Sequence, residues 1–194
     1  MIILASTSQT RQAILANAGV RFTTVSPEVD ERRLVAQNPH WSPDEISLRL
    51  AEAKALDVSR RNPQALVIGA DQVLALGDRV YSKPKDLTDC RNQLLELRGQ
   101  SHRLISSVTC ARQGASTWSL TDTALLAMRH FSDEFVDTYL QGNAANCMKS
   151  VGGYQIEGLG LQLFSSISGG YFTILGLPLL PLLDYLRQEA ELLT

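Results

Sequence analysis

The hydrophobic and polar residues along the chain predict strands and helices that alternate at first and then lead into a long hairpin. Continuous or alternating hydrophobic runs are typical of strands, and hydrophobic residues spaced three and four apart are typical of helices. Strands are expected over residues 2–4, 21–25, 65–74, 79–81, 101–111 and 117–128, and helices over 13–18, 43–59, 87–98, from 132 onward and over 178–192. A long hairpin beside strand–helix units favours an α/β fold with a mixed central β-sheet and flanking helices.

Asp71 stands out in this pattern because it interrupts the strand-like hydrophobic run over residues 65–74. Burying an ionised carboxylate without a partner is costly, so such an acid pairs with a cation, caps a backbone segment or faces a cleft. Gly69 and Ala70, directly before it, are small enough to let another backbone or a ligand approach. Taken alone, this segment is equally compatible with a structural acid and with a site acid.

The polar turn after the first strand is a second candidate for chemistry. Ser6, Thr7 or Ser8 can cap the helix that follows, and this is the simplest explanation for them. The same geometry leaves free backbone N–H groups and a partial positive charge at the helix start, which suits a phosphate. Arg11 is unfavourably placed for the helix dipole in the first turn, and an anionic ligand would give it a purpose.

Other charged residues occur at loop corners and on a helix face. Glu31 closes a turn with three acids in four positions, for which solvated loop acids are the common explanation. Lys54 lies near the buried side of the helix over 43–59, where it either borders a cleft or extends to the surface. Lys83 is held on a stiff corner by Pro84. Residues 143–160 are glycine-rich, and we expect them to be irregular.

Length and composition narrow the class of protein. A chain of 194 residues fits one domain over residues 1–194, and a domain of this size buries roughly 70% of its unfolded surface. Hydrophobic residues make up 44% and charged residues 20%, which is typical of globular proteins. The formal net charge of -2 gives no general attraction for nucleic acid or anionic lipid. We therefore expect neither as a partner, and any anion would have to be held by local cations.

The cysteines and the N-terminal residues bear on the cellular compartment. Cys90, Cys110 and Cys147 are odd in number and form no CxxC pair, which argues against a disulfide framework or a structural zinc site. Residues 1–6 are too short for a signal peptide and lack a basic region, and no hydrophobic run reaches the length of a membrane span. We expect a cytoplasmic protein.

Several common catalytic motifs are absent from the sequence, namely GxGxxG after a strand, GxxxxGK[ST], GxSxG and HExxH. The three histidines are scattered, which argues against a histidine metal site. Carboxylates bind Mg²⁺ or Mn²⁺ as hard oxygen ligands, whereas cations and helix N-termini hold phosphate oxygens. The sequence therefore favours a metal-assisted phosphoryl site, with three acids and three cations as its candidates: Glu31, Asp71, Glu157, Arg11, Lys54 and Lys83.

The order of several short motifs resembles the Maf family of nucleoside triphosphate pyrophosphatases over nearly the whole chain. The family's opening signature is similar to Leu4-Ala5-Ser6-Thr7-Ser8 followed by Arg11. Its later blocks are similar to residues 27–31 (PEVDE), 50–55 (LAEAKA), 69–73 (GADQV), 82–84 (SKP) and 153–158 (GYQIEG). One block alone would be weak evidence, whereas several in the right order are strong evidence.

The resemblance implies a fold of the inosine triphosphate pyrophosphatase type, with two lobes around a cleft and often a homodimer. It implies a house-cleaning enzyme that cleaves between the α and β phosphates of a nucleotide, giving monophosphate and pyrophosphate with Mg²⁺ or Mn²⁺ as cofactor. Asp71 would orient or deprotonate the attacking water and would hold the metal together with Glu31. The triphosphate would be bound by Ser6, Ser8, Arg11, Lys54 and Lys83.

Three further positions concern the base of the nucleotide. The dTTP/UTP-type members usually have Thr after the catalytic Asp and Gln in the late glycine block, whereas this chain has Gln72 and Glu157. These two residues resemble the branch that acts on 7-methyl-GTP. Glu157 could accept from the N–H edge of guanine and face the positive charge of the methylated ring. Thr10 is the third specificity candidate, because members commonly have Pro followed by Arg or a bulky residue where this chain has Gln9-Thr10.

Other functions stay open at this point. A dTTP/UTP or broad-specificity pyrophosphatase is the alternative within the same class. From another class, a nucleotide-binding regulator of cell division would use the same residues without turnover, although the presence of Asp71, Glu31 and Lys83 favours the enzyme. The third explanation is a generic α/β domain whose acids are solvated and whose cations pair on the surface.

Overall fold

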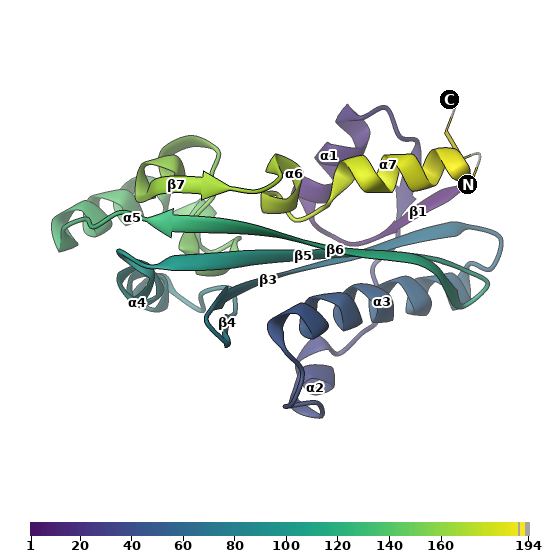
Figure 1. The fold of residues 1–194 in the computed structure, drawn as a ribbon, viewed down its shortest axis with the longest axis horizontal. Coiled ribbons are helices and arrows are strands. Elements are labelled where there is room, and N and C mark those ends of the chain that lie inside the picture. Colours follow the sequence, from purple (N-terminus) through teal and green to yellow (C-terminus); the bar gives the residue numbers. More distant parts are fainter. Residues whose placement is uncertain (190, 193–194) are drawn as a thin grey trace. The chain divides into compact units, whose positions relative to one another are not determined.

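The computed structural model describes residues 1–189, 191 and 192. In this part of the chain seven strands form one mixed sheet in the order β2-β1-β3-β5-β6-β7, with β4 paired to β3 (Figure 1). The strands are β1 (Ile2–Ala5), β2 (Phe22–Thr24), β3 (Leu66–Leu76), β4 (Arg79–Tyr81), β5 (Ser101–Arg112), β6 (Ala115–Met128) and β7 (Phe164–Ser168). The predicted α/β fold with a mixed sheet and flanking helices is confirmed.

The contacts within the chain divide it into two compact units. The first unit comprises Met1–Gln72, Ile105–Thr123 and Gly170–Thr194, and the second comprises Val73–Leu104 and Ala124–Gly169. The helices of the first unit are α1 (Gln9–Asn17), α2 (Glu31–Ala36), α3 (Pro43–Arg61), α6 (Tyr171–Ile174) and α7 (Leu179–Gln188). The second unit contains α4 (Leu87–Leu97), α5 (Asp133–Cys147) and the 3-10 segments η1 (Val151–Gly153) and η2 (Gly158–Leu163). The expectation of one domain over residues 1–194 stays a prediction.

The first unit contains three neighbouring parallel strands, beside parts of β5 and β6. β1 lies between β2 and β3, with Ile2 opposite both Phe22 and Leu66. Helices α1, α6 and α7 cover one side of this part of the sheet and α3 covers the other (Figure 1). Since both faces of β1 are covered, all four of its residues are buried, and so the strand is hydrophobic throughout rather than alternating.

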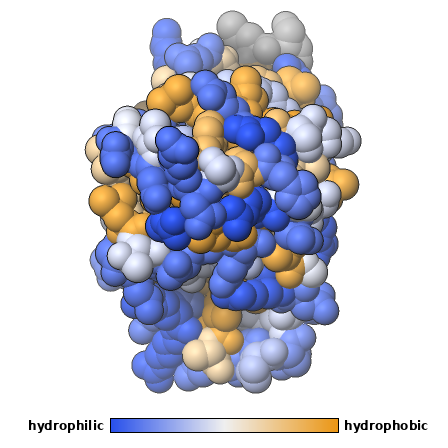
Figure 2. Space-filling view, turned by 90° about the vertical axis from the view of Figure 1, so that its left-hand side faces the viewer, coloured by the Kyte–Doolittle hydropathy of each residue, from blue (hydrophilic) through white to orange (hydrophobic). Residues whose placement is uncertain are grey.

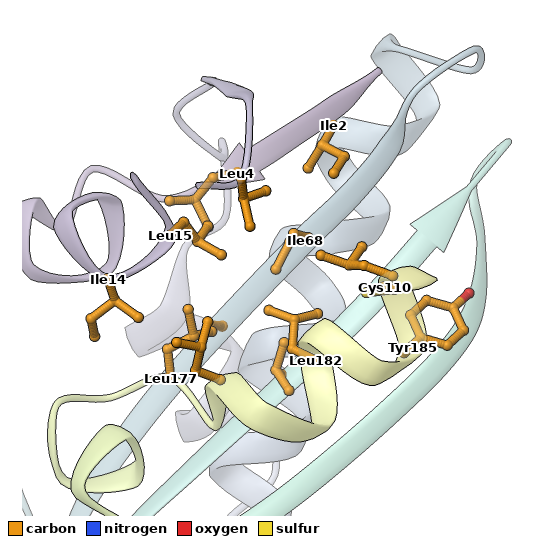
Figure 3. Close-up of a cluster of buried hydrophobic side chains, with 14 of the residues drawn as sticks. Ile2, Leu4, Ile14, Leu15, Ile68, Cys110, Leu177, Leu182 and Tyr185 are labelled. Atoms are coloured by element: carbon orange, nitrogen blue, oxygen red, sulfur yellow. The ribbon is translucent and has the colours of Figure 1, made fainter. Parts of the chain in front are cut away.

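The main core of the first unit lies between the sheet and the helices α1 and α7. Ile2 and Leu4 from β1, Ile68 from β3 and Leu182 from α7 converge there with Leu15 from α1 (Figure 3). The spacing of Ile2 and Leu4 puts both on one face of the strand. Ile3 and Ala5 point to the opposite face and pack against Val58 of α3. The alternation of side chains along β1 thus supplies two cores at once.

Helix α3 lies unusually close to the central strand β3. Its start is fixed by the predicted capping box, in which the Ser42 hydroxyl accepts from Glu45 N and the Glu45 carboxylate accepts from Ser42 N. A Cβ atom placed on Gly69 would lie 2.3 Å from the carbonyl oxygen of Ala51. Glycine at this position, opposite small alanines, therefore lets the helix backbone approach the strand.

The second unit packs α4 against α5 and η1. Arg91 Nε of α4 donates to Asp137 Oδ1 of α5 at 2.7 Å, and Arg98 Nη1 donates to Asp133 Oδ1 at 2.7 Å. The buried ring of His102 on β5 hydrogen bonds through Nε2 with the Tyr154 hydroxyl, 2.6 Å away. The unit thus combines surface ion pairs with a buried polar pair.

Some predicted boundaries were wrong, and two elements were not expected. Residues 31–36 form the helix α2, and only its first residue, Glu31, belongs to the acidic turn expected from the sequence. Strand β7 was not expected either. Helix α5 continues to Cys147 into the segment predicted to be irregular. Helix α7 ends at Gln188, before the predicted end at 192; residue 190, within the predicted span, lies outside the described residues.

The described part of the chain contains no helix that is both long and apolar enough to cross a membrane. Figure 2 shows one face of the molecule, on which hydrophobic residues lie in separate groups between hydrophilic ones. Among the described residues, the exposed large hydrophobic side chains come from several elements, including Leu87 of α4 and Leu180 of α7.

Candidate active site

Asp71 lies on β3 in a buried ion pair. Lys54 Nζ donates to Asp71 Oδ1 at 2.7 Å, and the two side chains are only 9% and 10% exposed. The same ammonium group lies 3.0 Å from Oε1 of Glu31, whose side chain is 46% exposed. One cation from α3 therefore connects a buried carboxylate on the sheet with a half-exposed carboxylate on α2.

The local fold explains why these three residues meet. The close contact of α3 with Gly69 brings the buried face of the helix, which includes Lys54, onto the end of the β3 segment that belongs to the first unit. Asp30 caps α2 by accepting from Arg33 N at 3.0 Å, so Glu31 is the first residue of that helix. Glu31, expected to close an acidic turn, is thus the first residue of a helix and contacts Lys54.

Burial and charge act in opposite directions on Asp71. Burial raises the pKa of Asp71, while the nearby Lys54 and Arg11 lower it, and the net effect leaves its pKa above the ordinary value. The pKa of Arg11 is lowered because its guanidinium is buried, although Asp71 and Glu31 act against this. The site therefore concentrates charges of which Asp71 and Lys54 are poorly solvated, which is typical of functional sites.

Ser6 and Ser8, in the turn between β1 and α1, both accept hydrogen bonds from nearby backbone N–H groups. The Ser8 hydroxyl caps α1 by accepting from Arg11 N at 3.4 Å, and the Ser6 hydroxyl accepts from Ser8 N at 3.1 Å. The simple capping explanation for this turn is confirmed, and it leaves the phosphate-binding role of both serines a prediction. Thr10 is exposed in the first turn of α1.

Arg11 is fixed by two backbone carbonyls. Its Nε donates to Gly176 O at 2.8 Å and its Nη1 donates to Ala70 O at 2.9 Å. The guanidinium thereby connects the residue before Asp71 with the segment between α6 and α7. The side chain is held in place beside Asp71, and Nη2 is the nitrogen that these two bonds leave over.

The side-chain amide of Gln72 is also engaged within the first unit. Its Nε2 donates to Ser106 Oγ, to Thr173 O and to Ile174 O at 2.9 to 3.0 Å. Ser106 Oγ donates in turn to Thr173 O at 2.7 Å, and the Thr173 hydroxyl donates to Asp122. Ser106 and Thr173 could not be predicted from the sequence, because their partners are distant in the chain.

Lys83 and Glu157 belong to the second unit. Lys83 is exposed between β4 and α4, next to the buried Pro84, as expected for a stiff corner. Glu157 is exposed directly before η2. The predicted roles of both residues stay predictions.

The carboxylates fit a hard divalent cation of the kind expected from the sequence. Mg²⁺ is usually bound by one or two protein carboxylates, with substrate phosphates and waters as further ligands. Glu31 and Asp71 supply two such carboxylates, and both lie within 3.0 Å of Lys54 Nζ. Within residues 1–189, 191 and 192 there is no group of three or more His, Cys, Asp or Glu side chains that could hold a metal alone. A metal bound here would therefore depend on the substrate phosphates.

Comparison with known proteins gives a match over almost the whole chain. Residues 1–189 match the family model described as Maf-like protein. The chain is 46% identical over 190 residues to a 7-methyl-GTP pyrophosphatase of Brucella abortus, covering 97% of this chain and 96% of the relative. It is 49% identical over 188 residues to a protein of the same name from Mesorhizobium japonicum, covering 96% and 94%. A nucleoside triphosphate pyrophosphatase of Rhodopseudomonas palustris is 46% identical over 188 residues, covering 97% and 93%.

Proposed function

The chain belongs to the Maf family and is a nucleotide pyrophosphatase, and we propose that it cleaves the α–β phosphoanhydride of a nucleoside triphosphate, with 7-methyl-GTP as the favoured substrate. The observation that carries this proposal is the buried Asp71, held 2.7 Å from Lys54 Nζ while the same ammonium contacts Glu31. A carboxylate with a raised pKa beside fixed cations is suited to accept a proton close to anionic phosphates.

In the proposed reaction Asp71 acts on the attacking water. Oδ1 of Asp71 accepts a hydrogen bond from Lys54 Nζ, so we propose that the other carboxylate oxygen, Oδ2, contacts the water. The water oxygen forms a bond to the α phosphorus while the bond to the α–β bridging oxygen breaks. Asp71 takes the proton, pyrophosphate leaves with the bridging oxygen, and the products are the nucleoside monophosphate and pyrophosphate.

The cations of the first unit are assigned to the phosphates. Arg11 is held rigidly by Ala70 O and Gly176 O, so its remaining nitrogen Nη2 can meet a phosphate oxygen with little further loss of side-chain freedom. Ser6 and Ser8 lie at the start of α1, where backbone N–H groups favour an anion. Lys54 would exchange part of its contact with the carboxylates for the triphosphate, and Lys83 is proposed to contribute a further cation.

Glu31 and Asp71 would hold the divalent cation, Mg²⁺ or Mn²⁺. When bound, such an ion neutralises phosphate charge and acts as a Lewis acid. The protein's own part is to keep the two carboxylates near each other in spite of their like charge. Lys54 does this in the structure described here by lying within 3.0 Å of both.

The preference for 7-methyl-GTP is supported by Gln72 and Glu157 in the sequence and by the names of several relatives. The amide nitrogen of Gln72 is bound to three oxygens of the protein. Any contact of this side chain with a base would therefore use Oε1 as an acceptor, which suits the N–H groups of a guanine edge. Thr10 and Glu157 are proposed as the other specificity residues, and a dTTP/UTP or broad-specificity enzyme is the alternative.

A substrate panel tests the proposed preference. Purified protein with Mg²⁺ or Mn²⁺ is assayed for pyrophosphate and monophosphate with 7-methyl-GTP, GTP, CTP, UTP and dTTP. We expect kcat/KM to be highest for 7-methyl-GTP, by about tenfold or more, which corresponds to about 1.4 kcal/mol. Equal or higher kcat/KM with dTTP or UTP would favour the alternative specificity, and the absence of pyrophosphate from every nucleotide would contradict the function itself.

A further inference from the structure

Ser47 is a buried polar residue that contacts Asp71 from the side of α3. Its side chain lies on the buried face of the helix and the residue is 0% exposed. Ser47 Oγ lies 3.3 Å from Asp71 O and 3.2 Å from Ile105 O, and its single hydroxyl proton is shared between the two carbonyls. We propose that Ser47 is a positioning residue for the proposed hydrolysis, which fixes the backbone of Asp71 so that the carboxylate keeps its place beside Lys54.

The helix contacts Asp71 at two points. Ser47 and Lys54 are seven residues apart, which is close to two full turns, so both side chains lie on one face of α3. Ser47 binds the backbone carbonyl of Asp71, while Lys54 binds its carboxylate. A residue bound by one helix at both backbone and side chain has little freedom to shift along the strand.

The close contact at Gly69 leaves little room for α3 and β3 to shift relative to each other. A Cβ atom at Gly69 would lie 2.3 Å from Ala51 O and 2.6 Å from Ala55 N, so the helix and the strand already touch next to these two contact points. Removal of the Ser47 hydroxyl leaves two buried carbonyl oxygens without this donor. The backbone of Asp71 then loses its hydrogen bond to α3, and its position depends more on the contact between Lys54 and the carboxylate.

The hydrogen-bond partners of Ser47 differ from those of an ordinary serine within a helix. A serine in the interior of a helix usually faces solvent or bonds to a carbonyl one turn back in the same helix. Ser47 instead donates to carbonyls of two strands, at residues 71 and 105. Alanine would be favoured at this position by helix propensity and would be equally small. The Ser47 hydroxyl therefore hydrogen bonds to the sheet and not to its own helix.

Ser59 provides a matched control on the same helix. It is also 0% exposed, and its hydroxyl accepts from Gly114 N at 3.0 Å, at the tip of the hairpin between β5 and β6. Ser47→Ala and Ser59→Ala thus each remove one buried hydroxyl from α3. Only the first removes a contact with Asp71, so a difference between the two variants separates positioning from general stability.

The inference rests on the proposed function, and its test measures kcat and KM with the nucleotide that the wild type hydrolyses best. We expect Ser47→Ala to lower kcat by about tenfold with KM changed less than about twofold, because a displacement well below 1 Å at the reacting group already costs rate. Ser59→Ala should keep both constants within about twofold of the wild type. Equal kcat values for the two variants would overturn the proposal, as would a change in KM alone.

If Ser47→Ala folds poorly, a second variant still tests the proposal. Ser47→Cys keeps a group of similar size with a weaker donor, and we expect its kcat to lie between those of the wild type and Ser47→Ala. Thermal unfolding is measured for all variants so that kcat is compared well below each Tm. A Ser47→Cys kcat below that of Ser47→Ala would contradict the proposal. If the wild type itself hydrolyses no nucleotide, the proposed function fails, whereas an active wild type with unaffected Ser47 variants refutes the positioning role alone.

Discussion

Lys54 Nζ donates to Asp71 Oδ1 at 2.7 Å in an ion pair whose two side chains are about nine-tenths buried. Both charges have lost most of their water, so each depends on the other for compensation. This relationship links the stability of the first unit to its chemistry. The acid proposed to act on water is also an acid that the fold must neutralise.

Replacing Lys54 should therefore destabilise the protein more than the loss of an ordinary ion pair does. Lys54→Met leaves Asp71 buried without its closest cation, and we expect a loss of about 3 kcal/mol in the free energy of unfolding. Urea unfolding at neutral pH measures this loss. In the double variant with Asp71→Asn, part of the stability should return, because no buried charge is then left alone.

The control for this prediction lies on the exposed side of the same helix. Arg49 pairs with Glu52 at 3.1 Å, with side chains that are 52% and 30% exposed. Since exposed pairs contribute little, Arg49→Met should cost less than about 1 kcal/mol. If Lys54→Met costs no more than Arg49→Met, the buried pair is not the stabilising contact described here.

Gly69 should tolerate no larger side chain. In Gly69→Ala the new methyl group would meet the backbone of α3 at Ala51 and Ala55, and we expect a loss of about 2 kcal/mol or more because backbone atoms cannot rotate away. Thermal unfolding and hydrolysis are measured together, and both should fall.

Gly142 is the comparison for that substitution. It lies within α5, and a Cβ atom there would meet only Leu159 Cδ1 at 3.7 Å, an ordinary contact distance. Gly142→Ala should raise stability by about 0.5 kcal/mol, because alanine is the better helix former. Equal effects of the two substitutions would refute the close approach of α3 to β3.

The buried His102 should make stability depend on pH in a mildly acidic range. Burial lowers the pKa of His102 from 6.5 to about 4. Between these values the unfolded chain binds a proton that the folded chain does not, so stability falls as the pH falls from about 6.5 to about 4, by about 3 kcal/mol at most.

Denaturant unfolding of the wild type and of His102→Gln across this pH range isolates the contribution of the histidine. Other groups titrate in both proteins, so the relevant quantity is the difference between the two free energies. This difference should move in favour of the variant as the pH is lowered. A difference that stays constant would mean that His102 binds its proton at the same pH in the folded and the unfolded chain, in spite of its burial and its contact with Tyr154.

The sequence predicted those parts of the site that depend on local pattern. The capping box at Ser42 located α3, and the spacing along that helix placed Lys54 near its buried side. The hydrophobic run before Asp71 located β3. Each of these features is determined by residues a few positions apart, whose physical preferences do not depend on the rest of the fold.

Other parts of the site could not be predicted because their partners are far away in the chain. Arg11 binds Gly176 O across 165 positions, and Gln72 binds Thr173 O across 101. No local pattern at Arg11 or Gln72 indicates such carbonyl partners. As a result, Arg11 was expected to meet only an anion, whereas two of its nitrogens hold the backbone.

Two elements were not predicted because they lack a buried hydrophobic face. Helix α2 has no buried residue, so its sequence lacks the periodicity that indicates a helix. Strand β7 is an edge strand whose residues are all half-buried or exposed, and its pattern is too polar to suggest a strand. The helix matters for the proposed function, because it carries Glu31 to the ammonium of Lys54.

Asp71→Asn tests the central claim most directly. Pyrophosphate release and nucleotide binding are measured side by side for the wild type and the variant, with Mg²⁺ or Mn²⁺ present. We expect the wild type to release pyrophosphate and Asp71→Asn to lose at least about a thousandfold in kcat while it still binds the nucleotide, because Asn keeps the shape of Asp but cannot take a proton from water. Equal behaviour of the two proteins would contradict the role assigned to Asp71, and binding without turnover by the wild type would favour a nucleotide-responsive regulator instead.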